Sequence, residues 1–319
     1  MTTQTDPDFV TICECFARDG LQHEPTFVPT ATKLMLLDAF FDAGFSRIEA
    51  TSYANPERLP AFRDATEVLS GLRRAPGVRY KATCPNVRGV ERALADLDAG
   101  HGADELSLLV SASESHSRRN LGTSRAEQWS KIVEMVALAA GRFRLVGVIS
   151  VAFGCPFEGA VDAAVVDSDF ARFADLGVDL VTVGDTTGVA TPPAVKEVFA
   201  RLAADHPAVP AVAHFHDTRG TAIANCVAAL EVGCRHLDSS FGGIGGHPSK
   251  IDYGAGDTGN VCTEDLADLL AAMGMATGLD RDRVAVASRL AEKALGRPLG
   301  SRVAKAGPRP EGGGVREHA

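Results

Sequence analysis

The segment Ala211-Val-Ala-His-Phe-His216 is a short apolar run that ends in two histidines, and Asp217 follows it directly. Its length and apolar character predict a buried strand. Side chains alternate along a strand, so the imidazoles of His214 and His216 point to the same side. A second polar motif, Arg18-Asp-Gly-Leu-Gln22, follows an apolar run near the N-terminus. If both runs are strands of one closed parallel barrel, their carboxyl ends share a rim and the two motifs meet there.

Outward from these motifs, strand-like apolar runs alternate with stretches whose apolar residues recur at three- and four-residue spacing, as in helices. The predicted strands are Phe9–Cys15, Arg47–Thr51, Arg79–Thr83, Glu105–Val110, Leu145–Ser150, Leu180–Gly184, Ala211–His216 and His236–Ser239. The predicted helices between them are Thr30–Ala43, Pro60–Leu72, Val87–Ala99, Ser124–Ala140, Asp167–Leu176, Pro192–Ala204 and Thr221–Val232.

Alternation of this kind predicts an α/β protein, and eight strands is the number that closes into a (β/α)8 TIM barrel. A doubly wound open sheet is the alternative, but no GxGxxG turn follows the first strand. We expect a tail over residues 1–8, a catalytic barrel over 9–303 and a disordered tail over 304–319. Extra C-terminal helices are expected at Thr263–Met275 and Asp282–Leu295.

The composition excludes several classes of protein. The 319 residues are 45% hydrophobic and 23% charged, which is typical of a globular chain. A net charge of -9 argues against a nucleic-acid surface. No apolar run reaches the roughly 18 residues needed to span a bilayer, and the polar, acidic Met1–Asp8 is unlike a signal peptide. Seven cysteines without a CxxC pair favour a reduced, cytoplasmic setting over a disulfide framework.

Asp19, His214 and His216 would together offer one carboxylate and two imidazoles, a set that can hold a divalent metal. Arg18 would lie beside them, where its charge can stabilise a developing oxyanion. The alternatives are two structural histidines and a plain Arg–Asp salt bridge. Glu49 and Asp185 end predicted strands on the face where TIM-barrel active sites form, although Asp185 also suits a cap for the next turn.

These residues carry a family resemblance over about Val10 to Val303. The chain resembles the 3-hydroxy-3-methylglutaryl-CoA lyases, which belong to the metal-dependent TIM-barrel enzymes that include the isopropylmalate synthases. Leu21 favours the lyase branch. The motifs that carry the resemblance are Arg18-Asp-Gly-Leu-Gln22, Ile48-Glu49, Ser111-Ala-Ser-Glu-Ser-His-Ser-Arg-Arg-Asn120, Gly154-Cys-Pro-Phe-Glu-Gly159, Gly184-Asp-Thr-Thr-Gly-Val189, His214-Phe-His-Asp-Thr218, Asp238-Ser-Ser240 and Gly259-Asn-Val-Cys-Thr-Glu-Asp-Leu266.

The resemblance implies metal ligation by four residues: Asp19, His214, His216 and Asn260. It also implies that Arg18 polarises a carbonyl group. It further implies that Gln22 contacts the substrate and that Glu49 and Asp185 lie in the active site. The implied ion is Mg²⁺ or Mn²⁺, although mixed nitrogen and oxygen ligands also suit Zn²⁺ or Co²⁺.

The chain departs from the lyase pattern at one position. The lyases carry a catalytic cysteine in a Gly-Gly-Cys-Pro loop after the eighth strand, whereas this chain reads Gly245-Gly-His-Pro248. An imidazole can handle a proton near neutral pH as the thiol would. His247 is therefore either the replacement catalytic group or an ordinary loop residue.

The sequence thus predicts a divalent-metal carbon–carbon lyase that cleaves a 3-hydroxyacyl-CoA or a related hydroxy acid by retro-Claisen or retro-aldol chemistry. The alternatives are an acyl-CoA-dependent condensing synthase and a non-catalytic barrel. We expect a small-molecule substrate, with a CoA thioester as one form, and neither nucleic acid nor membrane as a partner. We also expect a homodimer or higher homo-oligomer.

Overall fold

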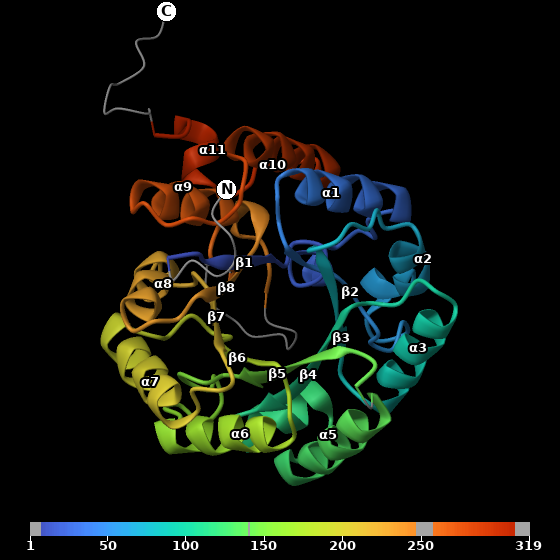
Figure 1. Cartoon of the computed structure of the whole chain (residues 1–319), viewed down its shortest axis with the longest axis vertical. Coiled ribbons are helices and arrows are strands. Elements are labelled where there is room, and N and C mark those ends of the chain that lie inside the picture. The colour runs from blue at the N-terminus through green and yellow to red at the C-terminus, as the bar shows by residue number, and fades with distance from the viewer. Residues whose placement is uncertain (1–7, 140, 247–257, 310–319) are drawn as a thin grey trace, which may run out of the picture.

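A computed structural model describes residues 8–139, 141–246 and 258–309. Within them, eight parallel strands form a closed barrel in sequence order, with β1 pairing to both β2 and β8 (Figure 1). The predicted TIM barrel is therefore confirmed. The strands are β1 (Thr11–Glu14), β2 (Arg47–Ser52), β3 (Arg79–Cys84), β4 (Glu105–Ser111), β5 (Arg144–Ser150), β6 (Leu180–Asp185), β7 (Ala211–Phe215) and β8 (His236–Ser239).

Helices surround the barrel as an outer ring (Figure 1). Those between strands are α1 (Thr30–Asp42), α2 (Ala65–Ser70), α3 (Val87–Asp98), α4 (Glu114–His116), α5 (Arg125–Ala139), α6 (Ala163–Asp175), α7 (Pro192–Asp205) and α8 (Ala222–Glu231). Shorter turns of helix are η1 (Gly20–His23), η2 (Pro60–Phe62), the π-helix η3 (Ser117–Leu121) and η4 (Phe241–Gly243).

The helix predicted over Pro60–Leu72 is wrong as a single element, because η2 and α2 are separated at Asp64. The Asp64 carboxylate accepts hydrogen bonds from Lys33 Nζ at 2.6 Å and from Thr30 Oγ1 at 2.7 Å. Both partners belong to α1. Contacts with a helix that is distant in sequence therefore hold Asp64 between η2 and α2. Hydrophobic periodicity carries no information about such contacts, so it could not predict the break.

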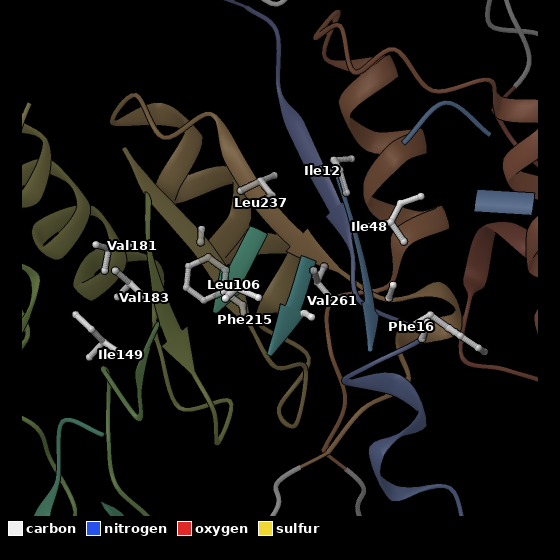
Figure 2. Packing of buried hydrophobic residues seen from close by; sticks show 14 of the residues in the cluster. Ile12, Phe16, Ile48, Leu106, Ile149, Val181, Val183, Phe215, Leu237 and Val261 are labelled. Carbon is white, nitrogen blue, oxygen red and sulfur yellow. The ribbon is translucent and has the colours of Figure 1, made fainter. Parts of the chain in front are cut away.

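The hydrophobic core lies between the barrel and the helices. Figure 2 shows strand side chains such as Ile12, Ile48 and Leu106 among the buried residues of this layer. The alternate positions of the same strands face the barrel interior and several carry charge. Arg47 and Glu105 are both buried there, and Arg47 Nε and Nη2 donate to Glu105 Oε2 at 3.0 and 2.8 Å. The interior is thus polar and ion-paired, unlike the layer outside it.

The C-terminal helices α9 (Thr263–Ala272), α10 (Arg281–Leu295) and α11 (Arg302–Ala306) pack at one side of the ring, near α1 (Figure 1). The domain boundary expected at 303 falls inside α11. Arg309 also pairs with Asp268 of α9, with Nε to Oδ2 at 3.0 Å. Residues 310–319 lie outside the described residues. None of the described helices combines the length and apolar character that crossing a membrane requires.

Candidate metal centre and active site

The backbone at the carboxyl ends of β1 and β7 brings the two sequence motifs together. Beyond β1 the chain turns sharply, and the Asp19 N–H donates to the Cys15 carbonyl at 2.8 Å. His216, the residue after β7, forms an isolated bridge with Asn260. The Val261 N–H also donates to the Phe215 carbonyl at 3.0 Å. The segment around Asn260 is therefore hydrogen-bonded to the end of β7, and the expected rim cluster forms.

Asp19, His214 and His216 form a compact group of potential metal ligands, with one ligand atom from each lying within 4.8 Å of the others. His214 Nε2 lies 3.2 Å from His216 Nε2, and His216 Nε2 lies 3.7 Å from Asp19 Oδ2. Asp19 and His216 are buried and His214 is partly buried. Two imidazole nitrogens and a carboxylate oxygen thus converge on one point, as a divalent ion requires.

Each histidine is oriented through its other ring nitrogen. His214 Nδ1 lies 3.2 Å from Asp238 Oδ2, and His216 Nδ1 lies 3.0 Å from Thr258 Oγ1. Partners at Nδ1 fix the tautomer and leave Nε2 as the ligand atom, which is the usual arrangement behind a metal-binding histidine. Burial alone would raise the pKa of Asp238, but Lys81 and His214 hold it below its ordinary value. Asp238 therefore stays ionised as the orienting acceptor.

Asn260 fits the fourth ligand position expected for it. Its Nδ2 donates to Asp19 Oδ2 at 2.6 Å and to the Ile244 carbonyl at 3.0 Å, which sets the direction of the amide. The opposite atom, Oδ1, is buried and has no hydrogen-bond partner among the described residues. A buried carbonyl oxygen without a partner costs free energy unless another group binds it. A divalent ion beside Asp19 would satisfy it, so the residues present fit a metal site.

Arg18 lies between two carboxylates at the edge of this group. Its Nη1 donates to Asp19 Oδ1 at 2.8 Å, and its Nε lies 2.9 Å from Glu49 Oε1. Burial opposes the charge on Asp19 and raises its pKa, but Arg18 and the two histidines together hold the pKa below its ordinary value. The salt bridge and the metal site are therefore compatible, because the same carboxylate serves both.

A cavity of about 140 Å³ opens beside these residues inside the barrel mouth. Arg18, Asp19, Glu49, Gln22 and both histidines line it, so most of the predicted site residues share one space. Its lining also includes Leu59, Pro85, Asn120 and Leu121.

Among the described residues predicted for the site, Asp185 and Asn260 do not line this cavity, and of the two only Asp185 has both side-chain oxygens committed to the backbone. Its Oδ1 accepts the Val189 N–H at 2.9 Å, and its Oδ2 accepts the Ala190 N–H at 3.0 Å. Burial raises the pKa of Asp185 to about 6. Both oxygens thus cap the turn after β6, which is the structural role that the sequence left open for this residue.

His247 lies outside the described residues, but the chain that leads to it is described. Gly245 packs so closely on the metal group that a Cβ there would lie 2.2 Å from Asn260 Nδ2 and 3.1 Å from Asp19 Oδ2. Gly246 lines the cavity. Gly246, the residue before His247, therefore lies at the candidate site.

Three further residues of the site carried no role in the sequence analysis: Lys81, Asp238 and Thr258. Lys81 is one of two charged residues in β3, Arg79 being the other, and Asp238 stands within a motif quoted only for its resemblance. A charged residue at an inward-facing strand position was the sequence signal that could have pointed to Lys81 and Asp238. A second cluster of ligand-type atoms, Cys13, Cys15 and Asp238, lies deeper in the barrel. It is a poorer cation site, because Lys81 already stands 3.8 Å from Asp238 and the pKa of Cys15 is raised.

Comparisons with known proteins agree with this geometry. The family model described as HMGL-like matches residues 9–291. The mitochondrial hydroxymethylglutaryl-CoA lyase of Rattus norvegicus is 37% identical over 303 residues, covering 95% of this chain and 90% of that protein. The hydroxymethylglutaryl-CoA lyase YngG of Bacillus subtilis is 39% identical, covering 93% of this chain and 96% of its own length.

A solved structure of an HMG-CoA lyase from Acinetobacter baumannii, in complex with coenzyme A and 3-methylmalate, superposes with a TM-score of 0.89 at 36% identity. The match covers 99% of this chain and 100% of that one.

Proposed function

Because the chain belongs to the HMGL-like family, we propose that it cleaves a 3-hydroxyacyl-CoA thioester of the hydroxymethylglutaryl-CoA type. The chain is a divalent-metal-dependent carbon–carbon lyase. The observation that carries the proposal is the group of Asp19, His214, His216 and Asn260 beside a cavity that is also lined by Arg18. A non-catalytic barrel would not need a buried amide oxygen without a partner in the same group as two converging imidazoles.

Asp19, His214 and His216, with Asn260 Oδ1, would hold the ion. We propose Mg²⁺ or Mn²⁺, with Zn²⁺ or Co²⁺ as alternatives compatible with mixed ligands. When bound, a divalent ion supplies Lewis acidity that favours ionisation of a hydroxyl group. Asp238 and Thr258 hold the two imidazoles in fixed orientations. The imidazoles therefore do not have to reorient during the reaction.

In the proposed reaction the C3 hydroxyl gives its proton to solvent, the C3–O bond becomes a carbonyl and the C2–C3 bond breaks. The electron pair of that bond moves to C2 and onto the thioester oxygen as an enolate. Protonation of C2 then gives acetyl-CoA and a 3-oxo acid. Arg18 lines the cavity beside Asp19, and its cation stabilises the negative charge as it develops on the thioester oxygen. Glu49 holds Arg18 in place through its 2.9 Å contact.

Protonation of C2 requires an acid at the mouth of the cavity. We propose His247, because an imidazole titrates near neutral pH and the described residue before it, Gly246, lines the cavity. Gln22, which also lines the cavity, is proposed as a substrate contact. The direction is cleavage rather than condensation, in keeping with the lyases that the chain resembles.

The test is a product assay on the purified, metal-loaded chain. We expect acetyl-CoA and acetoacetate from 3-hydroxy-3-methylglutaryl-CoA, loss of the activity with a chelator and its return with Mg²⁺ or Mn²⁺. His247→Ala should slow turnover by about 10²- to 10⁴-fold, the usual share of a general acid–base group. If free hydroxy acids are cleaved and no CoA thioester is, the proposed substrate class is wrong. A wild-type rate for His247→Ala would assign the proton to another group.

We also propose a cytoplasmic location, supported by seven cysteines that are all free in the structure. The expected homodimer or higher homo-oligomer stays a prediction, which light scattering on the purified chain tests.

A further inference from the structure

Glu14 is a buried carboxyl group at the end of β1 that the proposed reaction does not use. It is 0% exposed, and it does not line the cavity beside the candidate metal ligands. Its Oε1 accepts the Phe16 N–H at 2.9 Å and the Phe241 N–H at 3.1 Å. Its Oε2 lies 2.6 Å from Thr263 Oγ1. Any effect of Glu14 on the site must therefore pass through these three partners.

The three partners belong to the segments that carry the two oxygen ligands proposed for the metal. Phe16 follows β1 in the turn that leads to Asp19. Phe241 begins η4, which leads to the rim at residues 244–246. Thr263 begins α9, three residues after Asn260. One buried carboxyl group thus joins the segments that supply Asp19 and Asn260.

These segments also contact one another at the candidate metal centre. Asn260 Nδ2 donates to the Ile244 carbonyl at 3.0 Å and to Asp19 Oδ2 at 2.6 Å. His214 lies on β7 and is held by the hydrogen bonds of the sheet, whereas Asp19 and Asn260 lie outside the named strands. The positions of the oxygen ligands therefore depend on contacts between loops, and Glu14 makes contacts to all three segments.

The surroundings of Glu14 favour its neutral form. Burial raises the pKa of Glu14 well above its ordinary value, and the nearby carboxyl group of Glu264 raises it further, against the lowering effect of its hydrogen bonds. A buried charge without an opposite charge beside it is costly. A neutral carboxyl group can donate through Oε2 to Thr263 Oγ1, which lies 2.7 Å from Ser239 Oγ. Its Oε1 meanwhile accepts the two backbone N–H groups, so every polar atom of the group is used.

We propose that Glu14, as a neutral carboxylic acid, is a positioning residue that holds Asp19 and Asn260 at metal-binding distance. This inference rests on the proposed function, because it concerns the metal group of the same site. Glu14 touches neither ion nor substrate in this role. It fixes the three segments before the ion binds, so the oxygen ligands need no rearrangement to receive it.

The experiment is a calorimetric titration of the metal-free protein with Mn²⁺. Glu14→Met has a side chain of similar length that cannot replace these hydrogen bonds. It should weaken Mn²⁺ binding by about 10- to 100-fold, the range found when groups behind metal ligands are altered. Glu14→Gln should stay within about threefold of the wild type, because its amide can donate to Thr263 Oγ1 and accept the same two N–H groups. A loss in Glu14→Gln as large as in Glu14→Met would overturn the neutral role.

Asp96→Leu is the matched control for lost stability. Asp96 is a buried carboxyl group of α3, 6% exposed, and it accepts the Tyr53 hydroxyl at 2.7 Å. It does not line the cavity of the site. The variant should unfold at a lower urea concentration, as Glu14→Met should, but bind Mn²⁺ as the wild type does. Wild-type affinity in Glu14→Met, or equal weakening in Asp96→Leu, would overturn the positioning role.

Thr263→Val provides the test if Glu14→Met does not fold. It keeps the shape of the side chain and removes the hydroxyl that contacts Glu14 Oε2. Mn²⁺ binding should weaken by about 3- to 10-fold, as expected for one neutral hydrogen bond. An unchanged affinity would contradict the proposal.

A product assay with 3-hydroxy-3-methylglutaryl-CoA separates this inference from the proposed function. If the wild-type chain cleaves no thioester but the variants differ in Mn²⁺ affinity as expected, the proposed function fails and the role of Glu14 stands. If thioesters are cleaved and Glu14→Met binds Mn²⁺ as the wild type does, the role of Glu14 fails and the function stands.

Discussion

At the scale of single residues, Arg18 makes two contacts that only a guanidinium can make together. Its Nη1 reaches Asp19 Oδ1 at 2.8 Å while its Nε lies 2.9 Å from Glu49 Oε1. A planar fork with several donors holds two carboxylates in fixed directions and still presents charge to the cavity. A lysine ammonium has one nitrogen and no such fork. A positive charge alone would therefore not reproduce both carboxylate contacts of Arg18.

Arg18→Lys should consequently lower kcat by about 10²-fold or more, the loss seen when a donor to developing negative charge is removed. Metal content and folding should survive, because Asp19 and the two histidines remain. Arg201→Lys, an exposed substitution on α7, serves as the control. Steady-state kinetics with metal analysis provide the measurement. A raised KM with an unchanged kcat would make Arg18 a binding residue instead.

Sequence reasoning predicted which candidate site residues lie together where their chemistry and their place at the ends of strands pointed to one position. His214, His216 and Asp19 could be placed together because the carboxyl ends of barrel strands share one rim. Lys81 was not placed with them, because β3 carries a second charged residue, Arg79, and neither belongs to a motif that points to a reaction. Asp185 was ambiguous for the opposite reason, since a carboxylate after a strand serves a turn as readily as a reaction.

At the scale of elements, hydrophobic alternation located every strand of the barrel, with ends shifted by at most two residues. Alternation works here because one face of each strand packs against helices and the other faces the barrel interior. On β2, Ile48 packs outward and its neighbour Glu49 points inward. The single helix predicted over Pro60–Leu72 is wrong because alternation does not detect the break at Asp64. The break between η2 and α2 depends on Lys33 and Thr30, which lie more than thirty residues away.

The segment 244–246 leads from the rim to residues 247–257, which lie outside the described residues. Gly245→Ala would place a Cβ 2.2 Å from Asn260 Nδ2, so Asn260 or the segment must move. Asn260 also holds Asp19, and the displacement should weaken metal binding by 10-fold or more, the range seen when groups behind metal ligands are altered. Calorimetric titration of the metal-free protein with Mn²⁺ measures this, with His216→Ala as the reference that binds no metal.

Gly220→Ala is the matched control for this variant. Gly220 has a φ of +72°, so a side chain there is strained, but no atom lies within 4 Å of its Cβ position. It should lose some stability and keep its Mn²⁺ affinity. Equal affinities for Gly245→Ala and the wild type would show that the segment does not constrain the ligands.

At the scale of the whole molecule, the barrel encloses a column of charge rather than an apolar core. Arg47, Glu105 and Arg144 are connected by contacts of 2.8 Å in its lower half, and Lys81 continues the column toward the rim. Replacing one partner of a buried ion pair leaves the other uncompensated, which is strongly destabilising. The interior that prepares the active site therefore also ties the stability of the fold to the ionisation of its residues.

His236 makes this dependence measurable. Burial first, and then the nearby charges of Arg47 and Arg144, lower its pKa to about 4 from an ordinary value of 6.5. The folded state therefore favours the neutral imidazole, while the unfolded chain takes up a proton near pH 6.5. The stabilising contribution of His236 is complete above pH 6.5 and is lost as the pH falls through 4. Its size is at most about 3.5 kcal/mol, since each pKa unit corresponds to about 1.4 kcal/mol.

Urea unfolding of the metal-free chain and of His236→Gln between pH 7 and pH 4 tests this. Other groups titrate in the same range, among them Asp185, so the informative quantity is the difference in the free energy of unfolding between the two proteins. Glutamine cannot take up a proton, and the wild type should lose up to about 3.5 kcal/mol relative to the variant as the pH falls. A difference that stays constant with pH would mean that His236 has the same pKa in the folded and unfolded states. The arginines of the barrel interior would then exert no net effect on it.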